Sequence, residues 1–121
     1  MESTRRLVSM VDENVYTIEC LNKEIKAIVS FTDSGINALV AGGDKSHIGV
    51  VSIMDESGGL STTIFPSHKE AVIAEKWAKA FYDKFKKAVV ISAGIHYDDI
   101  SKEEISLVLE AADKLLMCAL K

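Results

Sequence analysis

Residues 73–92 read IAEKWAKAFYDKFKKAVVIS and contain the change of period that decides the fold. In the first part, apolar residues recur at helical spacing, and charged residues occupy the rest of the helix surface. The apolar positions are Ile73, Trp77, Ala80, Phe81 and Phe85. Residues 88–92 then form a short apolar run, which is typical of a strand inside a sheet. The stretch therefore predicts an amphipathic helix followed by a buried strand.

Five strand-like runs precede this helix. They are rich in β-branched and apolar residues, and turn residues such as Asn22-Lys23 and Gly42-Gly43-Asp44 separate them. The runs are residues 14–21, 24–32, 36–41, 47–54 and 60–65. Because short turns join them, we expect a continuing antiparallel meander.

Two capping boxes mark helix starts. Ser67 with Glu70 begins the first helix just after Pro66, and Ser101 with Glu104 begins a second helix that runs nearly to the C-terminus. Both helices should cover one face of the sheet. The expected fold class is α+β, a two-layer sandwich of a largely antiparallel sheet of about six strands and two helices on one face, in the order βββββαβα. We expect residues 1–121 to form a single domain.

Composition excludes several classes of protein. A hydrophobic content of 48% excludes a disordered chain, and a net charge of -4 with scattered lysines gives no general attraction to nucleic acid. No uncharged apolar run approaches the ~20 residues that a membrane helix needs. We expect a soluble, cytoplasmic protein with no nucleic-acid and no membrane partner.

Each of the three histidines stands beside a turn or at a helix start. If the helix from His68 is a crossover to a strand parallel to the fifth one, His68 and His96 both follow carboxyl ends of strands. His47 begins the strand antiparallel to the fifth, so it belongs to the same edge. The topology therefore predicts that three separate segments place a histidine on one rim.

Such a rim suits either of two ligands. Helix-start amides, the Ser67 hydroxyl and the charges of Lys45 and Lys69 suit an anion such as a phosphate. Three neutral imidazoles, with Asp44 or Asp98, suit zinc or a similar divalent metal ion. The metal ligands would be His47, His68 and His96. Both interpretations hold if a bound metal ion in turn binds the phosphate. The alternative to both is that the histidines are solvated surface residues with no functional role.

Three blocks of sequence, taken together, resemble a known family. They are GGDKSHIG at residues 42–49, PSHKE at residues 66–70 with AEKWAK at residues 74–79, and VISAGIHYD at residues 90–98. In this order and spacing they resemble the small LpdD-like proteins associated with gallate and other UbiD-type decarboxylases. The resemblance spans roughly residues 36–116.

This resemblance implies a chaperone that binds prenylated FMN, or FMN, and assists its delivery to a UbiD-like decarboxylase. The implied activity is binding and transfer rather than turnover, and it fits a rim that accepts a phosphate beside an apolar wall for a ring. The cofactor-binding residues carried over, or added from the anion argument, are Asp44, Lys45, His47, Ser67, His68, Lys69 and His96.

Two other functions compete with this one. The protein would be a small metal-dependent enzyme, hydrolase-like, if the histidines held an ion and Asp44 or Asp98 acted as the base. It would be an accessory subunit of a decarboxylase, with no ligand of its own, if an edge strand or an exposed face docked on the larger enzyme. Open sheet edges also make a homodimer an expectation to test.

Overall fold

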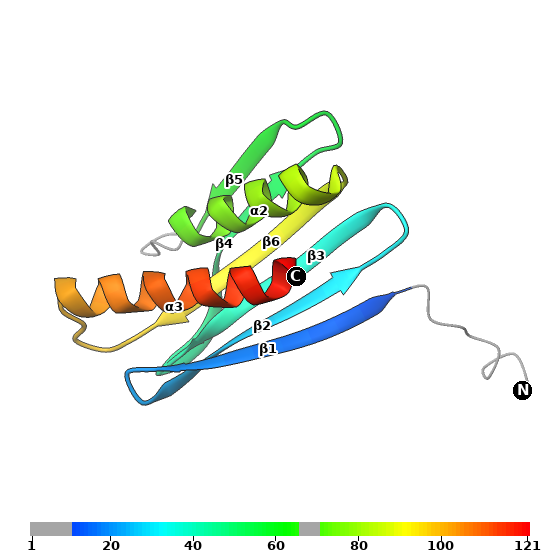
Figure 1. Ribbon diagram of the computed structural model, residues 1–121. Helices are drawn as coiled ribbons and strands as arrows, with labels where there is room; N and C mark the ends of the chain where they lie inside the picture. Colours follow the sequence, from blue (N-terminus) through cyan, green and yellow to red (C-terminus); the bar gives the residue numbers. More distant parts are fainter. Residues whose placement is uncertain (1–10, 66–70) are drawn as a thin grey trace, which may run out of the picture.

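The computed structural model describes residues 11–65 and 71–121, and Figure 1 shows the arrangement of their strands and helices. The elements follow one another in the predicted order of five strands, a helix, a strand and a helix. They are β1 (Asp12–Cys20), β2 (Lys23–Phe31), β3 (Gly35–Gly43), β4 (Lys45–Met54), β5 (Leu60–Ile64), α2 (Ala71–Phe85), β6 (Ala88–His96) and α3 (Lys102–Leu120). The α+β class and the chain order are thus confirmed.

The strands of the described chain form one six-stranded sheet in the spatial order β1-β2-β3-β6-β4-β5. Neighbours are antiparallel except β3 and β6, which are parallel, so the sheet is mixed. The expectation of a continuing meander was wrong, because β6 inserts between β3 and β4. Buried residues alternate with half-buried ones over residues 88–93 of β6, and a strand of this apolar character is most stable when it is paired on both edges.

The β1–β2 hairpin follows from its turn. Leu21 and Asn22 both have positive φ, 54° and 65°, and Cys20 pairs directly with Lys23. A two-residue turn of this kind matches the right-handed twist of the flanking strands. The hairpin therefore has a continuous register from Asp12 to Cys20.

Both helices cover the same face of the sheet, as Figure 1 shows. Helix α2 packs against β4 and β6, and α3 packs mainly against β1 and β2. The core between the layers contains fully buried Trp77 and Phe81 from α2 and fully buried Ile25, Val40 and Ile91 from the sheet. Burying a side chain of this size contributes about 1.5–3 kcal/mol.

Helix α3 begins at the predicted capping box. The Ser101 hydroxyl accepts from the Glu104 backbone N–H at 3.1 Å, and the Glu104 carboxylate accepts from the Ser101 backbone N–H at 2.9 Å. The corresponding box at Ser67 and Glu70 lies outside the described residues. In the part of the chain that is described, no helix combines the length and apolarity that crossing a membrane requires.

The other face of the sheet, called the open face below, faces away from both helices. Its residues alternate with core residues along each strand, as Leu39 does between buried Ala38 and Val40. Residues that pair across strands share a face, so Lys26 and Ala41 lie beside each other there, and so do Leu39 and Ser92. This face contains the candidate site.

Candidate functional site

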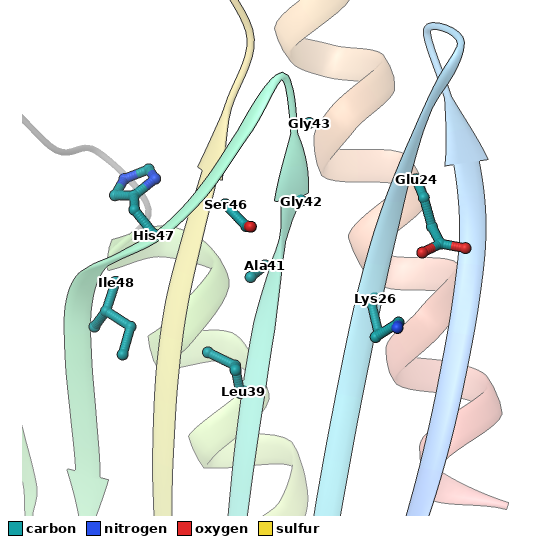
Figure 2. Close-up of a pocket in the computed structure, with 9 residues that line it drawn as sticks. All are labelled: Glu24, Lys26, Leu39, Ala41, Gly42, Gly43, Ser46, His47 and Ile48. Atoms are coloured by element: carbon teal, nitrogen blue, oxygen red, sulfur yellow. The ribbon is translucent and has the colours of Figure 1, made fainter.

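The candidate site results from an irregular start of β4. Gly43 and Lys45 both pair with His96, and the Asp44 backbone N–H donates to the His96 carbonyl at 2.6 Å. The regular pairing of β4 with β6 then breaks after Ser46 and resumes at Val50. Between these points β4 passes over the open face of β6 and reaches its far side, as Figure 2 shows.

Gly94 allows this crossing. A Cβ atom added to Gly94 would collide with the His47 carbonyl and would also meet the Ile48 nitrogen. Because both are backbone atoms, no side-chain rearrangement relieves the collision. Glycine at position 94 is therefore a structural requirement for placing His47 above β6.

The crossing segment forms one wall of an open groove of about 480 Å³. Figure 2 shows the nine residues that line it, which come from the end of β3 and the neighbouring parts of β2 and β4. They are Glu24, Lys26, Leu39, Ala41, Gly42, Gly43, Ser46, His47 and Ile48. The volume is within the range of small-molecule sites, about 300–1,000 Å³.

Bare backbone forms part of the groove. A Cβ atom at Gly42 would collide with the Glu24 carbonyl, and one at Gly43 would collide with the His96 carbonyl. Gly43 also has a φ of +88°, which residues with a side chain rarely adopt. Both glycines line the groove, so main-chain atoms form part of its wall at this end of β3.

The groove has an apolar part and a polar part. Leu39, Ala41 and Ile48 supply the apolar side chains, and Lys26 and His47 supply nitrogen donors. Glu24 lies at the same end of β2 as Lys26, so the groove contains both signs of charge. This combination suits a molecule with an apolar ring and a polar tail.

Hydrogen bonds hold the rim beside the groove. The Asp98 backbone N–H donates to the Asp44 carboxylate at 2.8 Å, and His96 Nε2 is 2.9 Å from the Asp98 carboxylate. Lys23 Nζ lies 3.7 Å from the other oxygen of the Asp44 carboxylate. Asp44 therefore ties the segment after β6 to the β3–β4 turn, and its carboxylate has a structural role.

Tyr97 links the same segment to β1, the strand at one edge of the sheet. Its hydroxyl donates to the Cys20 carbonyl at 2.7 Å, and the side chain is buried. The pKa of Tyr97 is raised to about 12. Burial is the largest cause, and the neighbouring Cys20 and Asp44 act in the same direction. The tyrosine is thus neutral at physiological pH and links the end of β6 to the end of β1.

The structure brings two of the three histidines together. The ring centroids of His47 and His96 are 6.3 Å apart, and His47 Nδ1 lies 3.5 Å from the Lys45 carbonyl oxygen. They meet because β4 and β6 are antiparallel neighbours. Since β5 is also antiparallel to β4, β5 and β6 run in the same direction, as the histidine prediction requires. The start of β4 and the end of β6 therefore share an edge. His68, together with Ser67 and Lys69, lies outside the described residues.

The other predicted site residues that the structure describes lie in the groove or on the rim beside it. His47 lines the groove, whereas Asp44, Lys45 and His96 lie on the rim beside it. Across residues 11–65 and 71–121, no three His, Cys, Asp or Glu side chains are grouped so that they could hold a metal ion. A metal held by His47, His68 and His96 stays a prediction.

The groove itself was missed at the level of sequence. The sequence predicts only that Lys26, Leu39 and Ile48 belong to strands, and these strands are separated in the chain. One signal was present, because β3 is apolar on both faces: Leu39 and Ala41 alternate with the core residues Ala38 and Val40. A strand of this pattern at an uncovered face indicates a binding surface.

Comparisons with known proteins agree with the three sequence blocks. The family described as the prenylated flavin chaperone LpdD-like domain matches residues 19–121. Protein LpdD of Lactiplantibacillus plantarum is 30% identical over 105 residues, which cover 83% of this chain and 77% of that protein. A chain in the crystal structure of a chaperone complex for yeast 20S proteasome assembly has a TM-score of 0.61 at 13% identity, covering 92% of this chain and 96% of that one. This last likeness shows the fold alone. The family match and the LpdD relative show that the chain belongs to the prenylated flavin chaperone LpdD-like family.

Proposed function

We propose that this protein binds prenylated FMN in the groove between β2, β3 and β4 and assists its delivery to a UbiD-like decarboxylase. Membership of the LpdD-like chaperone family supports the chaperone role. The observation that carries the binding proposal is the groove, in which an apolar wall, bare glycine backbone and nitrogen donors converge. The role is binding and transfer, with no chemical turnover.

The apolar part of the groove suits the ring system. Leu39, Ala41 and Ile48 offer aliphatic surface to a flat aromatic ligand, and Gly42 and Gly43 add main-chain atoms to the same wall. Prenylation adds apolar area to the flavin, and burying apolar area is worth about 25 cal/mol per Å². The prenylated form should therefore bind more tightly than FMN.

The polar part suits the phosphate end. Lys26 supplies a full positive charge, and Ser46 and His47 supply side-chain hydrogen-bond donors from the crossing segment. Lys45 and His96 extend this set at the rim, where Asp44 holds the turn in place. The Glu24 carboxylate repels an anion, so the phosphate should lie nearer to Lys26 and His47 than to Glu24. Ser67, His68 and Lys69 belong to the proposed cofactor-binding set through the family resemblance and the anion-binding chemistry of a helix start.

Release is part of the proposed role. The groove opens on the face of the sheet opposite to the helices, so a bound flavin keeps one side accessible. A decarboxylase that buries both sides of the ring would bind the cofactor more tightly and would draw it away. Transfer then follows from the difference between the two affinities.

Anaerobic equilibrium binding tests the first step. Prenylated FMN and FMN are titrated into the wild type, Ile48→Asp and the control Ile64→Asp, and flavin fluorescence is measured. Ile48 and Ile64 are both exposed, by 46% and 53%, but only Ile48 is part of the groove lining. We expect Ile48→Asp to weaken binding at least about tenfold, because a carboxylate replaces apolar wall, and Ile64→Asp to bind like the wild type.

Activity of an apo-decarboxylase tests the second step. Protein loaded with prenylated FMN should restore activity faster than the same amount of free cofactor, and loaded Ile64→Asp should do the same. Ile48→Asp should give no gain over free cofactor. If the wild type binds neither flavin, the proposal is wrong; binding without a gain in decarboxylase activity would leave a flavin-binding protein and remove the delivery role.

A further inference from the structure

The open face carries an apolar band that neither helix covers. Strand register aligns Val15, Ile28, Leu39 and Val51 in one row across the sheet, and this row passes through Ser92 of β6. The next row adds two further apolar residues, Val90 and Ile53, which pair with each other. These six aliphatic side chains, called the apolar band below, extend from β1 to β4.

The band is accessible to solvent in the isolated chain. Val15 is 53% exposed and Ile53 is 42% exposed, while the other four side chains are half-buried by their neighbours in the sheet. The helices lie on the opposite face. A contiguous aliphatic surface of this kind is a characteristic of protein interaction sites.

We propose that a second copy of this chain packs on the open face, with the two sheets face to face. Most strands here have nine or ten residues, so they are about 30 Å long, and six strands span roughly 29 Å. The face therefore offers on the order of 800 Å², which is what each partner contributes to a standard stable interface. Two sheets packed in this way form a core of the kind found in β-sandwiches.

Charges at the border of the band favour a second copy of this chain over a partner whose surface is entirely acidic or entirely basic. Lys26 lies in the row next to the band, Glu24 and Glu19 pair with each other one row beyond it, and Glu13 lies at the opposite border on β1. A face with both signs of charge is self-complementary in a two-fold dimer, since a lysine of one copy can meet a carboxylate of the other. An entirely acidic or basic partner would meet like charge in part of this border.

The proposed dimer interface borders the groove. Leu39 belongs both to the band and to the groove lining, so a copy seated on the band lies beside the groove. The dimer itself rests on the apolar band and does not depend on flavin binding.

The molar mass of the full chain in solution tests this inference. Light scattering coupled to size exclusion, with sedimentation velocity as a second method, should give twice the chain mass of 13.2 kDa for the wild type without flavin. Val51→Lys and Ile53→Lys, which place a charge in the band, should give the mass of one chain. The control Met117→Lys changes a 64% exposed residue of α3 and should leave the mass doubled.

A crosslink at the centre of the face gives independent evidence if a lysine variant fails to fold. Ser92 lies in the row of the band, and Cys118 is the exposed native thiol. In a Cys118→Ser background, Ser92→Cys should be joined to a second copy by a short thiol crosslinker, and the background protein should not. A wild type with the mass of one chain would overturn the inference, as would a doubled mass that survives Val51→Lys combined with Ile53→Lys. Loss of decarboxylase binding in Ile53→Lys, from a wild type that is monomeric, would assign the face to the decarboxylase and would also overturn it.

Discussion

Gly94 of β6 lies directly against the backbone of His47, where β4 crosses the open face of the sheet. This contact joins the fold to the candidate site. It lets β4 begin next to β3 and continue on the far side of β6, and it places His47 on the wall of the groove. The position of the histidine thus depends on a residue with no side chain.

Gly94→Ala should destabilise the protein. The added methyl group meets the His47 carbonyl and the Ile48 nitrogen, so the crossing segment has to move. We expect a loss of about 1–3 kcal/mol in the free energy of unfolding, the usual range for overpacking, measured by urea denaturation. Flavin affinity should fall as well, because the moved segment carries one wall of the groove.

Gly35→Ala is the matched control for this substitution. A Cβ atom at Gly35 would have its nearest neighbours at 3.5 Å, an ordinary contact distance. Its stability should stay within about 0.5 kcal/mol of the wild type. Equal destabilisation by the two variants would show that the crossing does not depend on glycine at position 94.

Periodicity was sufficient to predict the elements and their chain order. The helical spacing of residues 73–85 and the apolar run at 88–92 are local signals, and the elements formed where these signals occur. The spatial order of the strands was not accessible in the same way. Glycine turns between residues 36–41 and 47–54 resemble those of a simple hairpin, and only the whole sheet shows that β6 separates the two strands.

Strand direction predicted part of the candidate site. It brought His47 and His96 to one edge, because direction alone decides which strand ends meet. The groove could not be predicted so simply, since it combines Lys26, Leu39 and Ile48 from three strands whose order in space was unknown. Gly94 belongs to the VISAGIHYD block, but its steric role depends on the crossing and appears only in three dimensions.

Tyr97 should make stability sensitive to alkaline pH. Its pKa is raised from 10.0 to about 12, so the folded state retains a proton that the unfolded state releases. The stabilisation is complete below the unfolded pKa of 10.0 and is lost as pH rises through the folded pKa of about 12. Urea midpoints measured from pH 9 to pH 11.5 should fall more steeply for the wild type than for Tyr97→Phe.

The same substitution should cost stability at neutral pH. Removing the Tyr97 hydroxyl leaves the Cys20 carbonyl without this 2.7 Å hydrogen bond, which typically costs about 1–2 kcal/mol in a buried setting. Tyr82→Phe is the control, because the Tyr82 hydroxyl donates to the Glu56 carbonyl at an exposed position. An alkaline profile of Tyr97→Phe that matches the wild type would contradict the assigned role.

The Ser101 cap should contribute measurably to the stability of α3. Ser101→Ala removes the acceptor for the Glu104 N–H and should lower the free energy of unfolding by about 1 kcal/mol. Ser106→Ala, also on an exposed part of α3, removes only a 3.4 Å bond to the Lys102 carbonyl and should have a smaller effect. Guanidinium denaturation of both variants checks this, and equal losses would argue against the capping box as the source.

Lys26 distinguishes the phosphate end of the proposed ligand from its ring. If its ammonium group interacts with the phosphate, Lys26→Ala should weaken FMN binding by about tenfold and leave riboflavin, which has the same ring without the phosphate, nearly unchanged. Lys79→Ala removes an equal charge from α2, which lies on the other face of the sheet, and should alter neither affinity. Added salt should reduce the advantage of FMN over riboflavin in the wild type, because it screens the charge pair. If Lys26→Ala weakened both ligands equally, the lysine would be acting through the shape of the groove, and the phosphate would have to be placed elsewhere on the rim.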